Sequence, residues 1–525
     1  MIKKTNQHID LKNLSKTEKI GQFFCPAAFI NDSDAEIQKL ENLIKDYHIG
    51  VLTFFHSRIS AASNFEGKRK VIRNENSYQR LQELINHYQS IAPTPLLISI
   101  DAEWGLAMRV ENTPQYPYAL TLGAIPEDQN ELIHQVGNAI GNDLKSIGIH
   151  MNLAPVVDIN MNPDNPVIGY RSFGQDKEQV IKRALLYYQG LKASGTLGCF
   201  KHFPGHGDTN IDSHLGLPLI SKTKEELYNQ ELYPFIKAIE QEVDSIMIGH
   251  LAVPSLSNDK NTSATLSKDI IKEVLRKELG FKGVVISDAL NMHSVSKLYD
   301  EKGMLEWKAF DAGNDILCFA EHVEEGINMI EKNASDHQIE ESILRIQKLK
   351  EHAFSQKKEN NDGGIDHTTL NLKIAETAIT MYKSDPESFK NYNTGEFEAI
   401  CIGKNNDCHF YNEIQKQRPS INMVSDTKTD LTTDHILIAL FPPSIKPLNN
   451  FGINEETKQF IAQLSKVKNV TLYLFGNPYA LRVLSTDYIK NIVLCYQDLE
   501  SFQRAAAQHF LGNHKAIGKI PVQLL

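Results

Sequence analysis

One stretch, FKHFPGHGDTNIDSHLGLP at 200–218, carries the densest group of chemically active side chains in this protein. Its ionisable residues are Lys201, His202, His206, Asp208, Asp212 and His214. Side chains of this kind cannot form a hydrophobic core, because each needs a partner or water. The intervening glycines and prolines exclude a regular helix, so we expect a loop after the apolar run 197–200. Polar side chains on a loop held by a rigid scaffold are typical of an active site.

Asp212 and His214 are separated by one residue, so the carboxylate can accept a hydrogen bond from the imidazole N–H. Such a bond fixes the tautomer and raises the basicity of the other nitrogen, as in an acid/base dyad. Two other interpretations stay open for this loop. Asp212 can cap a turn beside a surface histidine, or His202, His206, Asp208 and His214 can ligate a metal. No standard zinc spacing is present, so we expect no metal.

More ionisable residues stand where short apolar runs end: Asp101, Asp158, Lys201, His202, His250 and Asp288. The runs are 22–27, 51–55, 96–100, 151–157, 197–200, 245–248, 283–286 and 315–319. Helical segments separate them, and one of these begins with a capping box from Thr223 to Glu226. Eight buried runs that alternate with helices predict a (β/α)8 barrel of the TIM type. The polar residues at the run ends then share the carboxyl-terminal rim, where such barrels carry their active sites.

The second part of the sequence predicts a smaller α/β domain. From 353 to 369 the sequence loses its apolar periodicity and gains charge and glycine, which is typical of a linker. Further strand-like runs follow at 398–402, 435–441, 470–475 and 492–496, with helical spacing between them. We therefore expect a barrel domain at 1–352, a linker at 353–369 and an α/β/α sandwich at 370–525, with an open sheet covered on both faces. No catalytic candidate stands out in the sandwich.

The composition limits the class of protein. The 525 residues exceed one hydrophobic core, and a formal charge of −10 argues against nucleic acid or an anionic membrane as the main partner. The first residues, MIKKTNQHIDLKNLSKTEKIGQ, lack the apolar segment of a secretory signal, and we expect no membrane span. Six scattered cysteines without a C-x-x-C pair indicate buried free thiols. These features predict a cytoplasmic protein.

The chain resembles family-3 glycoside hydrolases of the β-N-acetylglucosaminidase branch. The loop motif KHFPGHGDTNIDSH at 201–214 carries the resemblance. Further matches occur in the order that this family shows: IDAEWGLAMR at 100–109, NLAPVVDINMNPDNPVIGYRSFG at 152–174, VVISDALNM at 284–292 and AGNDILCF at 312–319. The resemblance spans nearly the whole chain and implies the same two-domain fold.

The resemblance implies a retaining exo-enzyme that removes non-reducing terminal GlcNAc from β-linked saccharides such as peptidoglycan fragments, as in muropeptide recycling. It assigns the nucleophile to Asp288 and the acid/base to His214, oriented by Asp212. These assignments agree with the residues: a strand-end carboxylate can attack and leave again, and an imidazole titrates near neutrality without burial. The residues implied for holding the GlcNAc unit are Asp101, Arg109, Arg171, Lys201 and His202. No cofactor is implied.

Several alternatives remain at the level of sequence. His214 is compatible with a β-N-acetylglucosaminide phosphorylase, because a neutral imidazole repels phosphate less than a carboxylate does. A β-glucosidase-type hydrolase, a non-catalytic sugar-binding relative and a metal hydrolase are the others. Trp104 stands where the family often has glycine, and SDAL at 287–290 replaces the commoner SDD. These departures leave the aglycone open, and the oligomeric state is unknown.

Overall fold

The computed structural model describes residues 10–61, 73–209, 216–259, 261–355, 366–389, 396–404, 408–419, 422–424 (backbone only) and 431–524. They form two compact units. The first comprises described residues of 1–116, 134–159 and 184–364, and the second those of 117–133, 160–183 and 365–525. Two segments that precede residue 184 therefore belong with the C-terminal part. The predicted boundaries at 352 and 370 stay a prediction, and most of the linker (356–365) lies outside the described residues.

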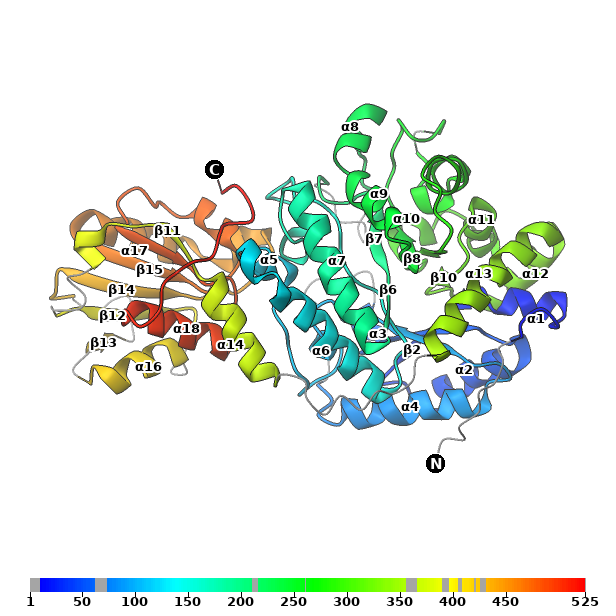
Figure 1. Ribbon diagram of the computed structural model, residues 1–525, viewed down its shortest axis with the longest axis horizontal. Coiled ribbons are helices and arrows are strands. Elements are labelled where there is room, and N and C mark those ends of the chain that lie inside the picture. Colours follow the sequence, from blue (N-terminus) through cyan, green and yellow to red (C-terminus); the bar gives the residue numbers. More distant parts are fainter. Residues whose placement is uncertain are drawn as a thin grey trace. The chain divides into compact units, whose positions relative to one another are not determined.

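The first unit contains a barrel of parallel strands, several of which are seen among its helices in Figure 1. Its strands are β1 (Phe24–Cys25), β2 (Ala27–Phe29), β3 (Val51–Phe55), β4 (Leu97–Ile100), β5 (Met151–Asn152), β6 (Leu197–Gly198), β7 (Phe200–Phe203), β8 (Ser245–Ile248), β9 (Val284–Ser287) and β10 (Leu317–Cys318). β1 and β2 are two pieces of one barrel strand, and so are β6 and β7. Parallel pairing runs from β2 to β6 and from β7 to β9.

Three contacts close the ring. Val156 pairs with Lys201, Ile286 pairs with Ile316, and β10 pairs with β1, all in parallel. In the part of the chain that the structure describes, the ring therefore has eight strand positions, which confirms the predicted barrel. One boundary differs from expectation. The fifth position continues to Phe203, so Lys201 and His202 lie within β7 and not after it.

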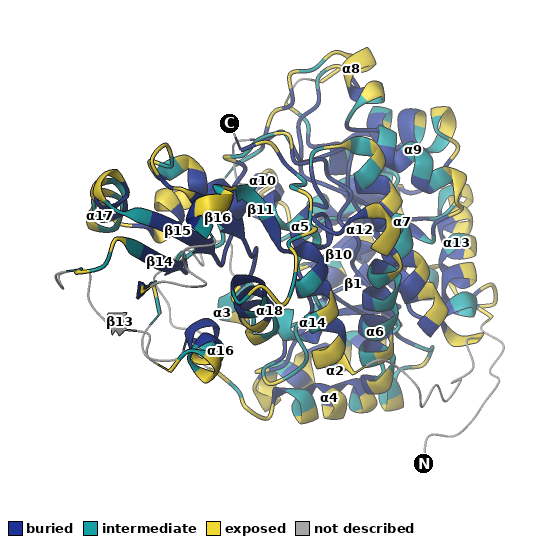
Figure 2. Ribbon diagram, turned by 60° about the vertical axis from the view of Figure 1, so that its left-hand side comes forward, coloured by how far each residue is buried: buried dark blue, intermediate teal, exposed yellow. Residues whose placement is uncertain are grey.

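Helices surround the barrel: α1 (Lys16–Gly21), α2 (Asp34–Tyr47), α3 (Arg58–Ala61), α4 (Ser77–Ile91), α6 (Glu131–Ile147), α7 (Lys177–Ser194), α8 (Lys224–Asn229), α9 (Tyr233–Glu240), α10 (His293–Ser296), α11 (Met304–Ala312), α12 (Val323–Asn333) and α13 (Asp336–Ser355). A π-helix occupies Asp269–Glu278. The predicted capping box is present at α8, where Thr223 and Glu226 bond reciprocally. In Figure 2 the strands β1 and β10 are buried, whereas α2 and α4 carry exposed residues along one side.

The second unit contains a six-stranded sheet in the order β11-β16-β15-β14-β12-β13. Its strands are β11 (Thr380–Lys383), β12 (Glu398–Ile402), β13 (Asn422–Val424), β14 (His435–Leu440), β15 (Asn469–Leu474) and β16 (Asn491–Leu494). Only β11 runs antiparallel to its neighbour. Four strands match the predicted runs, whereas β11 and β13 were not predicted. β11 is short and mostly half-exposed, so it lacks the continuous apolar run of a central strand.

Helices cover both faces of this sheet, as predicted. α17 (Glu455–Val467) lies on one face, and α14 (His367–Ala378), α16 (His409–Gln417) and α18 (Glu500–Phe510) lie together on the other (Figure 1). Tyr411 of α16 donates its hydroxyl hydrogen to Ile400 or Leu437 and accepts from the amide of Ala439. The same unit includes α5 (Ala119–Leu122), whose residue Thr121 donates to Gln497 of the C-terminal part. The fold class expected from the sequence is confirmed.

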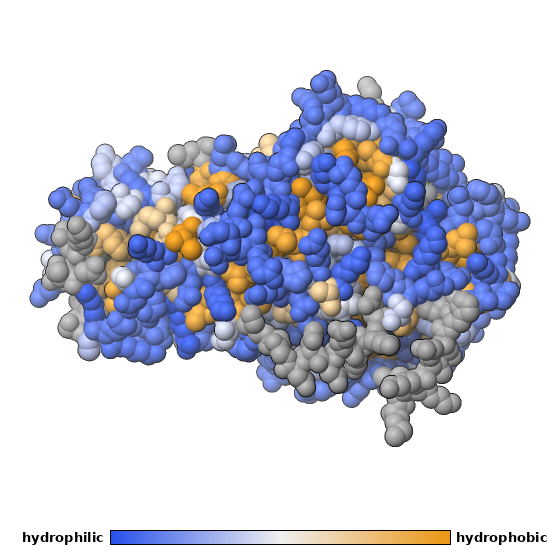
Figure 3. Space-filling model, in the orientation of Figure 1, coloured by the Kyte–Doolittle hydropathy of each residue, from blue (hydrophilic) through white to orange (hydrophobic). Residues whose placement is uncertain are grey.

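Surface and thiols agree with a globular protein. The face drawn in Figure 3 is mostly hydrophilic. All six cysteines are free; five are buried as predicted, whereas Cys401 is half-exposed. None of the described helices is both long and apolar enough to cross a bilayer.

Candidate active site

The carboxyl ends of the barrel strands bring together residues that are far apart in sequence. Asp101 directly follows β4, Lys201 lies in β7 and Asp288 directly follows β9. Because all barrel strands are parallel, these ends meet at one rim. The bridge between Val156 and Lys201 fixes β7 beside the segment that follows β5. The rim predicted from the run ends is therefore formed.

Four side chains form an almost enclosed, charge-balanced group that we call the rim cluster: Asp101, Glu103, Arg109 and Lys201. Lys201 Nζ lies 2.8 Å from Asp101 Oδ1 and 2.8 Å from Glu103 Oε1. Arg109 Nη2 lies 3.1 Å from Asp101 Oδ2. The Lys201 side chain is only 3% exposed, so its charge has to be matched by the two carboxylates.

The cluster also sets the protonation state of Asp101. Burial alone would raise the pKa of its carboxyl group, but Lys201 and Arg109 outweigh this and hold the pKa below its usual value. Asp101 is therefore a carboxylate at neutral pH. A carboxylate flanked by two cations can accept from one or two hydroxyl groups, while the cations donate to their neighbours.

Arg109 is fixed by stacking as well as by charge. Its guanidinium carbon lies 3.8 Å from the centroid of the Phe55 ring at the end of β3. Its Nε is buried and has no hydrogen bond partner among the described residues. This N–H is therefore an unsatisfied donor inside the site.

His202 is oriented by a buried carboxylate. Asp158 Oδ2 lies 2.7 Å from His202 Nδ1, and Asp158 also accepts from the backbone N–H groups of His202 and His206. Burial would raise the pKa of Asp158, but His202 and the contacts from His206 hold the pKa below normal. Because the ionised carboxylate only accepts, Nδ1 is the donor in this pair. Asp158 is therefore a positioning residue.

The loop after β7 begins with residues that hold its shape. His206 is buried, and its Nδ1 lies 2.7 Å from Thr209 Oγ1. Burial lowers the pKa of His206 to about 4, so it is neutral. Asp208 pairs with Lys222 at 2.6 Å. These contacts indicate that His206 and Asp208 hold the shape of the first residues of the loop. The chain enters it through cis peptide bonds at Lys201–His202 and Phe203–Pro204.

Asp288 is held by its own backbone and by the neighbouring strand. Its N–H donates to Ile248 at 2.9 Å, and its Oδ1 accepts from the Ala289 N–H at 2.8 Å. His250 Nε2 lies 2.9 Å from the carbonyl oxygen of Ala289, and its Nδ1 lies 2.8 Å from Thr265 Oγ1. His250 thus supports the turn that carries Asp288. It is another positioning residue.

The structure gives no position relative to the rim cluster for three of the predicted site residues. Asp212 and His214 lie outside the described residues, between Thr209 and Gly216. Arg171 belongs to the second unit, where its Nη1 donates to the carbonyl oxygen of Val167 at 3.3 Å. The roles of all three stay predictions.

Sequence reasoning missed Glu103 and the role of Asp158. Glu103 lies two residues after Asp101, and Tyr187 donates its hydroxyl hydrogen to the backbone carbonyl of Glu103 at 3.1 Å. One signal was present in the sequence. A lysine in a buried strand needs compensating charge, and Asp101 alone cannot balance both Lys201 and Arg109.

Metal binding has no support among the groups that the structure describes, because no three His, Cys, Asp or Glu side chains converge there. Asp212 and His214 are not among them, so the absence of a metal stays a prediction.

Comparison with known proteins gives a consistent result. The family model for the glycosyl hydrolase family 3 N-terminal domain matches residues 16–349. Beta-hexosaminidase A from Pseudoalteromonas piscicida is 33% identical over 379 residues, which cover 66% of this chain and 61% of that protein. This chain thus spans less than two thirds of that relative's length.

Two solved structures resemble the whole chain. A glycoside hydrolase family 3 beta-N-acetylglucosaminidase from Paenibacillus sp. str. FPU-7 is 25% identical, with a TM-score of 0.76, over 97% of this chain and 99% of that one. A beta-glucoside phosphorylase shares the fold with a TM-score of 0.80 at 18% identity, over 98% of this chain and 95% of that one. These solved structures therefore share the fold of both the barrel and the sandwich.

Proposed function

This chain belongs to glycosyl hydrolase family 3, and we propose that it is a retaining exo-β-N-acetylglucosaminidase that removes GlcNAc from the non-reducing end of β-linked saccharides. One observation carries the proposal: the rim cluster lies at the same strand-end rim as Asp288. A group that accepts from and donates to sugar hydroxyls thus stands beside a candidate nucleophile. The relatives named β-hexosaminidase and β-N-acetylglucosaminidase support the choice of sugar.

In the proposed mechanism, the rim cluster holds the terminal sugar. Asp101 accepts from a vicinal pair of hydroxyls, while Lys201 and Arg109 donate to the oxygens that remain. His202 is proposed to add a further contact, and Arg171, which the family resemblance implies for the same sugar, is proposed as a further donor. Because the charges of the rim cluster are already balanced, a neutral sugar adds no unpaired charge to the enclosed site.

Asp288 is proposed as the nucleophile. Its carboxylate attacks the anomeric carbon as the bond to the leaving oxygen breaks, which gives a covalent glycosyl-enzyme. The Ala289 N–H bond to Oδ1 holds the carboxylate in one orientation for this attack. Water then attacks the opposite face, so the configuration is retained.

His214 is proposed as the acid and base, with Asp212 as its orienting partner. The imidazolium protonates the leaving oxygen in the first step, and the imidazole takes a proton from water in the second. The buried contacts of His206 with Asp158 and Thr209 support the role of this loop, because they anchor its first residues to the barrel. The loop can then present a group to the rim.

We propose GlcNAc-terminated peptidoglycan fragments as substrates, in a cytoplasmic recycling role. Product analysis tests the activity. The purified enzyme is given a GlcNAc–MurNAc disaccharide with and without phosphate, and the first-formed anomer is followed by proton NMR. We expect free GlcNAc, formed first as the β-anomer, in both buffers and in no measurable amount with Asp288→Ala. The α-anomer as first product would refute retention, and GlcNAc 1-phosphate would identify a phosphorylase.

A further inference from the structure

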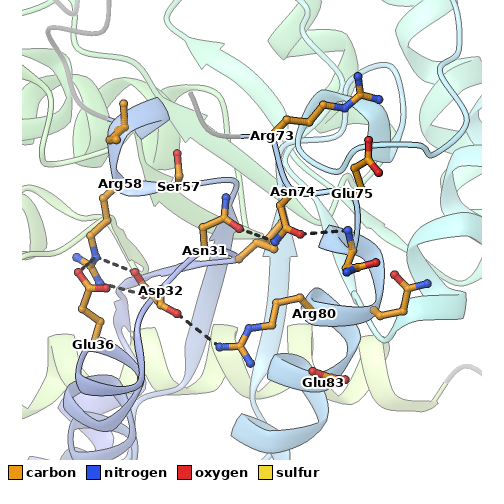
Figure 4. A pocket seen from close by; sticks show the side chains of 14 residues that line it. Asn31, Asp32, Glu36, Ser57, Arg58, Arg73, Asn74, Glu75, Arg80 and Glu83 are labelled. Carbon is orange, nitrogen blue, oxygen red and sulfur yellow. Dashed lines mark hydrogen bonds and ion pairs between the residues drawn. The ribbon is translucent and has the colours of Figure 1, made fainter. Parts of the chain in front are cut away.

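A cavity of about 940 Å³ lies at the first two strand positions of the barrel, outside the rim cluster. Its walls come from residues 30–36 after β2, residues 57–59 after β3 and residues 73–83, which lead into α4 (Figure 4). All three stretches belong to the first unit. A cavity of this volume can hold one sugar or a peptide of a few residues.

The cavity wall is bonded directly to residues that flank the rim cluster. His56 Nε2 lies 2.7 Å from Glu111 Oε1, and this same oxygen accepts from the backbone N–H of Asn74 at 3.0 Å. His56 follows Phe55, on whose ring Arg109 is stacked. The loops after β2 and β3 that line the cavity leave the barrel at the same rim as Asp101 after β4, so the cavity lies on the face of the barrel that carries the proposed sugar site. An exo-enzyme encloses the terminal sugar, so the rest of its substrate has to occupy space beside that site.

Part of the charge in the cavity is internally compensated. Arg58 Nε lies 2.8 Å from Asp32 Oδ1 and 2.7 Å from Glu36 Oε1, and its Nη2 lies 3.0 Å from Asp32 Oδ2. Its guanidinium carbon also lies 4.7 Å from the centroid of the Phe29 ring. Both carboxylates of this group are paired with Arg58, so the group mainly holds the loops after β2 and β3 together.

The other charged side chains have capacity for a ligand. Arg73 donates to Asn112 Oδ1 at 2.9 Å, and Arg80 donates to the carbonyl oxygen of Asp32 at 3.5 Å. Each guanidinium has five N–H donors, so most of that capacity is unused by these bonds. Glu75 and Glu83 have no side-chain partner among the described residues and also line the cavity. Two cations and two anions thus face one space.

This arrangement selects an amphoteric ligand. A purely anionic ligand would be repelled by Glu75 and Glu83, and a purely cationic one by Arg73 and Arg80. A ligand with carboxylates and an ammonium group satisfies both pairs. Side-chain amides in the wall add donors and acceptors that match peptide groups; they belong to Asn31, Asn74, Asn76 and Gln79.

We propose that this cavity binds the peptide carried by the leaving-group sugar, a short chain with free carboxylates and an ammonium group. The inference rests on the proposed function, because it requires the terminal sugar to lie in the rim cluster. It assigns the preference for peptide-bearing substrates to Arg73, Arg80, Glu75 and Glu83.

The test compares three substrates: an aryl β-GlcNAc glycoside, the GlcNAc–MurNAc disaccharide, and this disaccharide with a tripeptide that carries carboxylates and one ammonium group. We expect the wild type to have its highest kcat/KM on the third. Arg73→Gln and Arg80→Gln should each lower kcat/KM on the tripeptide substrate, relative to the aryl glycoside, by about 2- to 5-fold, the scale of an exposed ion pair. The effect should shrink as salt rises.

Two controls sharpen the comparison. Lys282→Gln removes an exposed cation just before β9, at the amino-terminal end of that strand, and should leave the substrate ratio unchanged. Glu83→Gln should lower kcat/KM on the tripeptide substrate, relative to the aryl glycoside, when the tripeptide carries a free amine. It should not do so when this amine is acetylated. Equal kcat/KM with and without peptide, or equal ratios for Arg73→Gln and Lys282→Gln, would overturn the inference. Loss of the proposed function is recognised separately, because the wild type would then not cleave the aryl glycoside.

Discussion

Replacement of Asp158 by asparagine tests whether this buried carboxylate organises the candidate site. Asp158 is 1% exposed and accepts from two backbone N–H groups and from His202 Nδ1. In Asp158→Asn the amide oxygen can keep the backbone donors, while the NH2 group faces Nδ1. His202 Nδ1 then faces a donor instead of an acceptor, so the ring loses the hydrogen bond that fixes its orientation.

The expected loss of stability follows from the three hydrogen bonds that Asp158 accepts. A hydrogen bond to a charged acceptor contributes roughly 1 kcal/mol more than a neutral one, so Asp158→Asn should cost about 3 kcal/mol of unfolding free energy. Asp158→Ala leaves three buried donors unsatisfied and should cost about 3–9 kcal/mol. For activity, one misdirected hydrogen bond from His202 should lower kcat/KM on an aryl GlcNAc glycoside about 5-fold.

Urea unfolding followed by tryptophan fluorescence measures the stability of the first unit, because both tryptophans, Trp104 and Trp307, lie in it. Asp46→Asn, an exposed change on α2, is the control. The folded pKa of Asp158 is depressed. The contribution of the Asp158 carboxylate to the free energy of unfolding is therefore fully present above the unfolded pKa of about 3.9. It is lost as the pH falls through the pKa of the folded state. An Asp158→Asn protein as stable as Asp46→Asn, with unchanged kcat/KM, would refute this role.

The remaining predictions concern catalysis, metals and pH. Asp288→Ala should stay folded but lose nearly all activity, and a fluorosugar inactivator should label wild type at Asp288; a label on another carboxylate found by mass spectrometry would contradict the assignment. His214→Ala should lose on the order of 10²–10⁴-fold more activity on a disaccharide, whose leaving oxygen needs a proton, than on a nitrophenyl glycoside. Asp212→Ala should match it and the double variant should be little worse, whereas equal losses on both substrates would refute the acid role. Dialysis against EDTA should leave kcat unchanged; a loss restored by zinc would indicate a metal enzyme. Burial, with a smaller contribution from nearby Lys350, lowers the pKa of His150 to about 4, so the unfolded state takes up the proton first and stability should fall as pH drops from about 6.5 to 4. His150→Asn should flatten this slope in urea titrations at several pH values, and an unchanged slope would argue against it.

Several features were predictable from the sequence because they are encoded locally. Strands buried on both faces give continuous apolar runs, so the barrel positions from β3 onward begin within two residues of the predicted runs, although β5 ends at Asn152 instead of 157 and the fifth position continues to Phe203. The first is displaced: the run 22–27 becomes β1 and β2, which extend to Phe29. The capping box is likewise encoded locally, because Thr223 and Glu226 are only three residues apart. Asp101, Lys201 and Asp288 could be chosen because each stands at a run end.

Other features depend on which distant residues the fold brings together. Glu103 acquires a role only because β7 places Lys201 beside the turn after β4. Asp158 was visible as a run end, but its three donors come from residues 44 to 48 positions away. The grouping of 117–133 and 160–183 with the C-terminal unit has no local signal either. The apolar pattern of a segment records whether it is buried, and burial is local. The partner of a buried charge is decided by strand order and register, which only the closed tertiary structure sets.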